Sequence, residues 1–164
     1  MYYFEILEAL YKKKVEYLII GGLAVNLYGV PRVTQDIDLI ISTTKRNITN
    51  ILSVLKKLGY LPRLPVDRRD LMDSEKVKDW VENRNLKAFS FYHKKDNYKV
   101  VDILLVHPLH FEDSFNNRTI KKINQVDIYL VSLSDLIKTK KLSARMQDLS
   151  DIKMLRKVKK LLGE

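Results

Sequence analysis

The chain has 164 residues, of which 46% are hydrophobic and 30% charged, and its 30 basic and 20 acidic residues give a net charge of +10. No apolar run approaches the roughly 20 residues that cross a bilayer, and the N-terminus lacks the pattern of a signal peptide, so we expect a cytoplasmic protein without a membrane segment. With 0 Cys and only 3 His, the composition excludes disulfide frameworks, thiolate zinc sites and cysteine nucleophiles, and any metal is expected on carboxylates.

The N-terminal half predicts, in order, a helix, a buried strand, a short helix, a second strand and a long helix. Their approximate ranges are 4–11, 15–20, 23–28, 35–41 and 48–58. Apolar residues recur at helical spacing in the first and last of these segments. Gly21-Gly22 ends the first strand, and Gly59 stands where the C-terminal cap of the long helix is expected.

The segment 62–85 contains prolines and dense charge, and we expect it to be a long connection with a helical turn near Trp80. Three strands follow, over 86–92, 98–106 and 126–131. The first two are separated by a turn-like stretch that fits an antiparallel hairpin.

Two helices are expected after the last strand. Ser132 and Asp135 have the spacing of a capping box, which predicts the start of the first. The inward face of the second is expected to hold Leu149, Ile152, Leu155, Val158, Leu161 and Leu162.

Together, these elements predict an α/β (α+β) fold with a mixed sheet flanked by helices. We expect one domain over residues 1–164, with a core over about 15–131 and a helical C-terminal part over about 132–162.

Carboxylates interrupt two apolar strands. Asp36 and Asp38 are separated by one residue, so the two-residue period of a strand points both to one face, where like charges repel unless a cation lies between them. Asp102 interrupts the apolar run 100–106, where an unpaired charge is disfavoured. Asp127 repeats this pattern nearer the polar start of its strand. The third acid therefore stays open between Asp102, which we prefer, and Asp127.

If the strand with Asp102 neighbours the strand with Asp36 and Asp38, three carboxylates converge. Hard oxygen ligands suit Mg²⁺, with Mn²⁺ as an alternative, better than softer metals. A pair of such ions can activate an attacking hydroxyl and stabilise the leaving oxygen of a phosphoryl displacement. The third acid would then accept the proton of that hydroxyl.

Gly21-Gly22 lies between a buried strand and a helix start, where backbone amides can receive a phosphate, although a plain tight turn has the same pattern. The order of glycine pair, short helix, Asp36-Ile37-Asp38 and a later lone Asp102 resembles the signature of the DNA polymerase β-like nucleotidyltransferase superfamily. The resemblance is closest to stand-alone AbiEii-type toxins and minimal nucleotidyltransferases. Its two blocks are Gly21-Gly22-Leu23-Ala24-Val25, Tyr28-Gly29, Arg32, Thr34 and Asp36-Ile37-Asp38-Leu39, and then Leu136-Ile137, Lys141, Ala144-Arg145, Asp148 and Asp151.

The resemblance implies that Asp36, Asp38 and Asp102 are catalytic and hold the metal, with Asp102 also acting as general base. It implies a nucleotide-binding site at Gly21, Gly22, Arg32, Thr34, Lys141 and Arg145. The alternative for Arg32 and Thr34, which flank the acid pair, is that they only fix the loop. Lys141 and Arg145 are four residues apart, so on one helix they would share a face and could clamp a phosphate tail. The alternative for this pair is a solvated basic helix face.

Two functions are consistent with these features. The first is Mg²⁺-dependent transfer of a nucleoside monophosphate from a nucleoside triphosphate to a hydroxyl. The positive charge is compatible with RNA, including tRNA, as acceptor. The resemblance implies a protein acceptor or the toxin of a toxin–antitoxin pair, bound by an acidic partner. Antibiotics are less expected acceptors for a chain of this length. The second is a non-catalytic module that binds nucleic acid or protein, although such a module is expected to lose one of the three acids.

Overall fold

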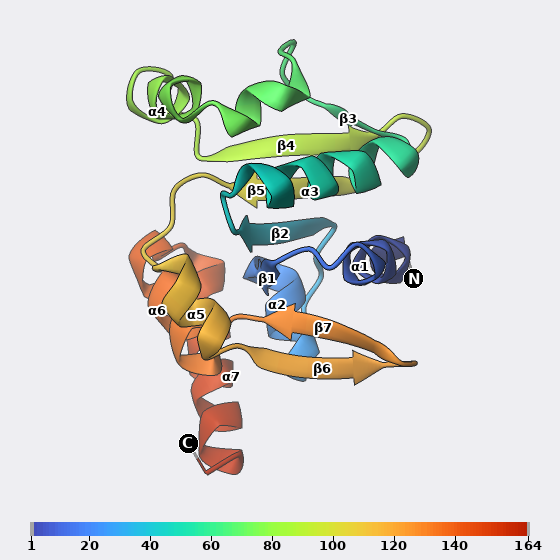
Figure 1. Ribbon diagram of the computed structural model, residues 1–164. Helices are drawn as coiled ribbons and strands as arrows, with labels where there is room; N and C mark the ends of the chain where they lie inside the picture. The colour runs from blue at the N-terminus through green and yellow to red at the C-terminus, as the bar shows by residue number, and fades with distance from the viewer. Residues whose placement is uncertain (1, 164) are drawn as a thin grey trace.

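The computed structural model describes residues 2–163 and contains a seven-stranded mixed sheet flanked by helices (Figure 1). The strands are β1 (Tyr17–Ile20), β2 (Asp36–Ile41), β3 (Tyr60–Pro62), β4 (Ala88–His93), β5 (Val100–Leu104), β6 (Thr119–Ile123) and β7 (Val126–Leu130). The helices are α1 (Tyr2–Lys12), α2 (Gly21–Leu27), α3 (Lys45–Lys57), α4 (Ser74–Glu82), α5 (Phe111–Asn116), α6 (Leu133–Ser143), α7 (Met146–Leu161) and the 3₁₀ helix η1 (Arg68–Met72). The expected α/β class with a mixed sheet is confirmed.

The strands are ordered β3-β4-β5-β2-β1-β7-β6. Near the centre, β2 pairs antiparallel with β1 and parallel with β5. The β4–β5 pair is antiparallel, as the turn between the two predicted strands indicated. The strand that carries the acid pair is therefore a direct neighbour of the strand that carries Asp102.

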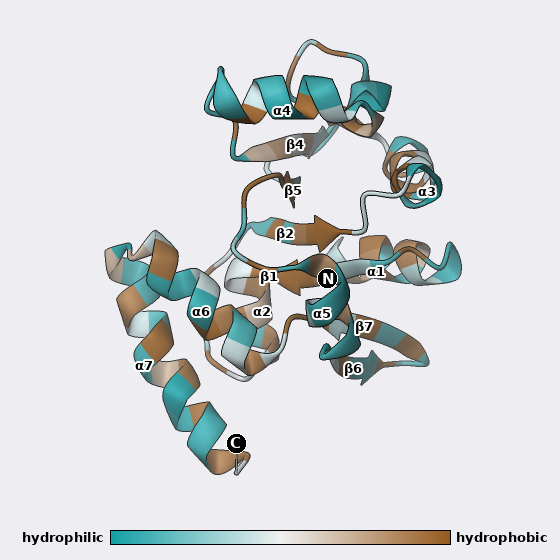
Figure 2. Ribbon diagram, turned by 60° about the vertical axis from the view of Figure 1, so that its left-hand side comes forward, coloured by the Kyte–Doolittle hydropathy of each residue, from teal (hydrophilic) through white to brown (hydrophobic). Residues whose placement is uncertain are grey.

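Helices cover both sides of the sheet. In the view of Figure 2, α1 and α3 lie on one side, and α2, α6 and α7 lie on the other. The central strands are buried on the α3 side through residues such as Ile37, Leu39 and Ile103, which are at most 1% exposed. None of the helices within residues 2–163 is both long and apolar enough to cross a membrane.

Side-chain caps explain where several helices begin. Thr44 Oγ1 accepts a hydrogen bond from the amide of Asn47 at the start of α3. At the start of α6, Ser132 Oγ accepts from the amide of Asp135, as the capping-box spacing predicted. The carboxylate of Asp135 accepts from Ser114 Oγ on α5, so this cap also joins the two helices.

The structure contains several elements that the sequence did not predict. The expected connection 62–85 contains η1 and the full helix α4. The strands β3 and β6 and the helix α5 were not expected. β3 has three residues, and β6 is a mostly polar edge strand that depends on pairing with β7, so neither has a clear apolar pattern.

The inward face expected for α7 is correct only in part. Ile152 and Leu155 are buried, whereas Leu149, Leu161 and Leu162 are 55%, 86% and 58% exposed. The reason is visible in Figures 1 and 2, where the C-terminal turns of α7 extend away from the sheet.

Candidate active site

Three carboxylates lie on one face of the sheet. Asp38 on β2 is paired directly with Asp102 on β5, so the two side chains stand side by side. Asp36 is two residues before Asp38 in the same strand and therefore points to the same face. The fold thus brings together the three acids that the sequence singled out.

Burial and the closeness of these acids to one another raise the pKa of two of them. The pKa of Asp38 is raised to about 6, first by burial and then by the negative charges of Asp102 and Asp36. Burial, followed by the charge of Asp102, also raises the pKa of Asp36. The positive charges of Arg145 and Lys140 act on Asp38 in the opposite direction. The acid cluster therefore lies next to a group of cations.

The carboxylate oxygens of the three acids are of the type that binds a hard divalent cation. Asp102 Oδ1 is buried and has no hydrogen-bond partner among the described residues, a costly state that a bound cation would relieve. A donor set of carboxylates alone suits a hard ion. Between residues 2 and 163, however, there is no group of three or more His, Asp or Glu side chains that could hold a metal ion as they stand.

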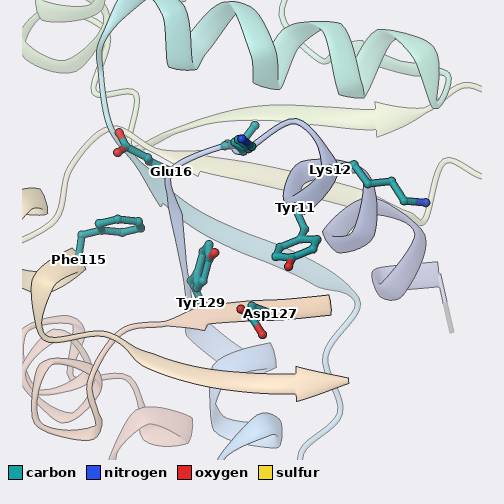
Figure 3. Close-up of a pocket in the computed structure, with 8 residues that line it drawn as sticks. Tyr11, Lys12, Glu16, Phe115, Asp127 and Tyr129 are labelled. Carbon is teal, nitrogen blue, oxygen red and sulfur yellow. The ribbon is translucent and has the colours of Figure 1, made fainter. Parts of the chain in front are cut away.

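Asp127, the alternative third acid, lies on β7 near the end of the sheet where β1 begins, whereas the acid pair lies near the end where β1 stops. Because Ile19 pairs with Leu130 in the parallel ladder of β1 and β7, Asp127 is level with Glu16, before β1 begins. Asp38, in contrast, pairs with the last residue of β1. Asp127 and Glu16 line a separate pocket of about 520 Å³ (Figure 3). Of the two alternatives, only the acid on β5 neighbours the pair on β2.

The glycine pair is packed against the acid-bearing strand. Gly21 has φ +68°, and a Cβ atom there would lie 2.0 Å from Asp38 Oδ2. A Cβ atom at Gly22 would lie 2.7 Å from Thr34 Oγ1 and 3.3 Å from Arg32 Cζ. Both positions therefore need glycine for close approach, and Gly21 also needs it for its backbone conformation.

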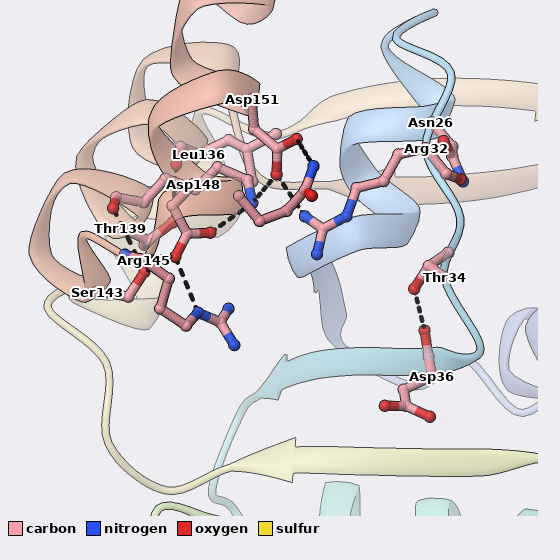
Figure 4. A network of polar contacts seen from close by, with 12 residues as sticks. Asn26, Arg32, Thr34, Asp36, Leu136, Thr139, Ser143, Arg145, Asp148 and Asp151 are labelled. Carbon is pink, nitrogen blue, oxygen red and sulfur yellow. Dashed lines mark hydrogen bonds and ion pairs between the residues drawn. The ribbon is translucent and has the colours of Figure 1, made fainter.

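Two buried acids hold three cations beside this glycine turn (Figure 4). Lys140 Nζ donates to Asp148 Oδ1 at 3.1 Å and to Asp151 Oδ2 at 2.7 Å. Arg32 Nη1 also donates to Asp151 Oδ2, and Arg145 Nε donates to Asp148 Oδ2 at 2.9 Å. The exposed fractions of Lys140, Asp148 and Asp151 are 4%, 1% and 3%. The network connects the loop before β2 to α6 and α7.

The expectation that Lys141 and Arg145 share a helix face is wrong. α6 ends at Ser143, Ala144 has the left-handed φ of +47°, and Arg145 is the N-cap of α7. Lys141 is exposed, whereas the neighbouring Lys140 is buried. Sequence reasoning missed Lys140, although it continues the buried stripe of α6 at helical spacing.

A cleft of about 590 Å³ lies between the sheet and the α6–α7 turn. Its lining residues are Ile20, Gly21, Asp38, Lys87, Leu104, Val106, His107, Pro108, Thr139, Lys140, Leu142, Ser143, Arg145 and Asp148. Of the sequence-predicted site residues, Gly21, Asp38 and Arg145 line it directly. Gly22, Arg32 and Thr34 support the glycine turn behind it.

A family model describes nearly the whole chain. Residues 4–161 match the family described as "Nucleotidyltransferase of unknown function (DUF6036)". No curated protein matches the chain in sequence.

Solved structures share the fold at low sequence identity. The lincomycin-bound lincosamide antibiotic adenylyltransferase LnuA is 19% identical with a TM-score of 0.63, and the match covers 95% of each chain. ANT(2")-Ia in complex with adenylyl-2"-tobramycin is 14% identical with a TM-score of 0.57, over 98% of this chain and 92% of the other. An antigenic nucleotidyltransferase-like protein from Paracoccidioides brasiliensis is 20% identical with a TM-score of 0.54, over 92% and 71%.

Substituting Gly21 tests the packing of the glycine turn. Gly29 has φ +91° but open space around it, so Gly29→Ala should cost about 1 kcal/mol of unfolding free energy from backbone strain alone. Gly21→Ala adds the clash with Asp38 and should cost about 1–3 kcal/mol more. Urea denaturation of both variants measures the difference, and equal losses would contradict the close approach.

Asp38 should make stability depend on pH in metal-free buffer. Because its pKa is about 6 in the folded protein and 3.8 in the unfolded chain, its contribution to stability is fully present below pH 3.8 and is lost as pH rises through 6. Asp38→Asn should therefore be more stable than the wild type at pH 7.5, by on the order of 2 kcal/mol. Chemical denaturation between pH 4 and 8 should show this gap closing toward low pH. A gap independent of pH would contradict the prediction.

The adjacent lysines of α6 should differ sharply in their effect on stability. Lys140→Met leaves Asp148 and Asp151 buried with one cation fewer, and should cost about 3 kcal/mol of unfolding free energy. Lys141→Met removes the same charge at an exposed position and should stay within about 0.5 kcal/mol of the wild type. Thermal denaturation of the two variants provides the comparison, and similar melting temperatures would argue against the buried network.

Proposed function

Because the chain belongs to the nucleotidyltransferase family DUF6036, we propose that it moves a nucleoside monophosphate from a nucleoside triphosphate to a hydroxyl acceptor in a Mg²⁺-dependent reaction. The observation that carries this proposal is the direct pairing of Asp38 with Asp102, with Asp36 on the same face. Such a cluster has no structural benefit without a cation, because each carboxylate raises the proton affinity of the next.

Asp36, Asp38 and Asp102 would hold Mg²⁺ or Mn²⁺. When bound, the metal supplies positive charge that favours ionisation of the attacking hydroxyl and stabilises the leaving oxygen. The free oxygen of Asp102 supports its second proposed task as general base, since an acceptor of a proton needs an unoccupied lone pair.

The proposed reaction is a single displacement at the α-phosphorus. The acceptor hydroxyl gives its proton to Asp102 and its oxygen bonds to the α-phosphorus. The bond from that phosphorus to the oxygen bridging to the β-phosphorus breaks, and pyrophosphate leaves with the electron pair.

The cations beside the cleft are suited to the phosphates. Gly21 opens the backbone for close approach, and Gly22 gives room to Arg32 and Thr34 behind it. Arg145 lines the cleft, and its side chain is largely exposed. Only its Nε is paired with Asp148, so the two terminal nitrogens of the guanidinium face away from that acid. We assign the phosphate contacts to the glycine turn, Lys140 and Arg145. Lys140 takes the place that the sequence gave to Lys141, because Lys141 is exposed and does not line the cleft.

For the acceptor, we propose a hydroxyl on RNA, including tRNA, or on a protein. The net charge of +10 supports a polyanionic substrate. The resemblance to AbiEii-type proteins extends the proposal to a toxin that an acidic antitoxin neutralises.

A small acceptor is the second candidate. LnuA, a lincosamide antibiotic adenylyltransferase, matches this chain over 95% of both lengths. Chain length therefore gives no reason to exclude a compact acceptor, and small hydroxylated compounds belong in the same assay.

The decisive experiment is transfer of label from the four α-³²P nucleoside triphosphates, with Mg²⁺, to total cellular RNA, protein or small hydroxylated compounds. Asp102→Asn should lower transfer by about 1000-fold, because it removes both a metal ligand and the proton acceptor. Asp127→Asn is the matched control on a similar strand and should stay within about threefold of the wild type.

Two outcomes would reject this assignment. If Asp102→Asn keeps its transfer activity while Asp127→Asn loses it, the third acid is wrong. If the wild type binds nucleic acid or an acidic protein without transferring label to any acceptor, the chain is a binding module.

A further inference from the structure

A stripe of cations runs along the second half of α7. Lys153, Arg156, Lys157 and Lys160 recur at spacings of three and four residues, so they share one side of the helix. All four are exposed. We call this set the α7 stripe.

The stripe is not neutralised within the described chain. No acidic residue lies between Ile152 and Gly163, and none of the four cations forms an ion pair with any other residue from Tyr2 to Gly163. Like charges three and four residues apart destabilise a helix. The helix dipole favours cations in the last turn, which accounts for Lys160 but not for Lys153 or Arg156 in the middle of the helix.

The stripe is aligned with the cleft. Arg145, the N-cap of α7, lines the cleft and precedes Arg156 by eleven residues, close to three full turns, so the two lie on the same side of the helix. The first turns of α7 are held at the cleft through Asp148 and Asp151, and the later turns project from the body (Figure 1). A polyanion that follows the stripe would therefore reach the cleft at Arg145.

We propose that the α7 stripe binds the phosphate backbone of an RNA acceptor and directs it into the cleft. This inference rests on the proposed function and narrows its acceptor to RNA. A row of unpaired cations at regular spacing matches the repeating charge of a backbone. No apolar residue interrupts the stripe itself between Lys153 and Lys160, although Leu149, one turn earlier on the same side, and Met154 and Leu161 beside it are exposed. An acidic protein that covers these apolar residues is therefore the competing outcome of the test.

The test is fluorescence anisotropy with a 5′-labelled, unstructured 20-nucleotide RNA. All variants carry Asp36→Ala, so that binding is measured without turnover and does not depend on catalysis. Lys153→Glu/Lys157→Glu should weaken binding at least about tenfold. It should also reduce the slope of log K against log salt by about 1.4, since each phosphate contact on a single strand contributes about 0.7.

The matched control is Lys56→Glu/Lys57→Glu, which makes the same charge change at exposed positions in the last turn of α3. It should bind within about threefold of the parent. A neutral pair, Lys153→Gln/Lys157→Gln, with helix content checked by circular dichroism, separates lost contacts from a lost helix.

Equal weakening in the stripe and control variants would overturn the proposal, because net charge alone would then explain binding. Unchanged RNA binding in the stripe variants would also overturn it. Loss of binding to polyglutamate with RNA binding retained would assign the stripe to an acidic protein instead. Because these measurements use an inactive background, they stand apart from the labelling assay that tests catalysis.

Discussion

Two carboxylates held side by side by a β-ladder are the constraint on which this site depends. The main-chain pairing of β2 and β5 places Asp38 against Asp102, and neither strand can slip without moving apolar residues such as Ile37 and Ile103 out of the core. The acids therefore cannot separate to relieve their repulsion, and the pKa of Asp38 rises to about 6. The folding energy of the apolar face thus maintains a repulsion between carboxylates that a proton or a bound cation would relieve.

A second set of constraints acts on the cations opposite these acids. Asp151 accepts from Arg32 and Lys140 at once, and Asp148 accepts from Lys140 and Arg145. Because these acids are buried, they hold the cations in fixed positions beside the cleft, where long exposed side chains would otherwise be mobile. The same network attaches α7 to the loop before β2. The position of the projecting half of α7 therefore depends on buried charges next to the site.

Much of the candidate site was accessible from the sequence because it depends on local patterns. The two-residue period of a strand places Asp36 and Asp38 on one face, and a glycine pair after a buried strand indicates a tight turn. Other features had no local pattern. Lys140 and Lys141 are adjacent in a basic stretch, and only packing of α6 decides which is buried. The edge strand β6 is polar and exists through its pairing with β7.

The amino-acid order by itself determined the class of fold, most of the central strands and helices, and the residue types available for chemistry, because these follow from periodicity, turn residues and burial cost. Tertiary structure alone decided which acid completes the cluster. Asp102 and Asp127 occupy similar apolar contexts, but β5 adjoins β2, whereas β7 adjoins β1 and places its acid at the opposite end of the sheet. It also decided how the break between α6 and α7 is packed. The contact of Arg145 with Asp148 at the start of α7 is local, but the burial of Asp148 and Asp151 against Lys140 and Arg32 depends on how α6, α7 and the loop before β2 come together. Strand order and this packing come from contacts between distant residues, which local spacing cannot specify.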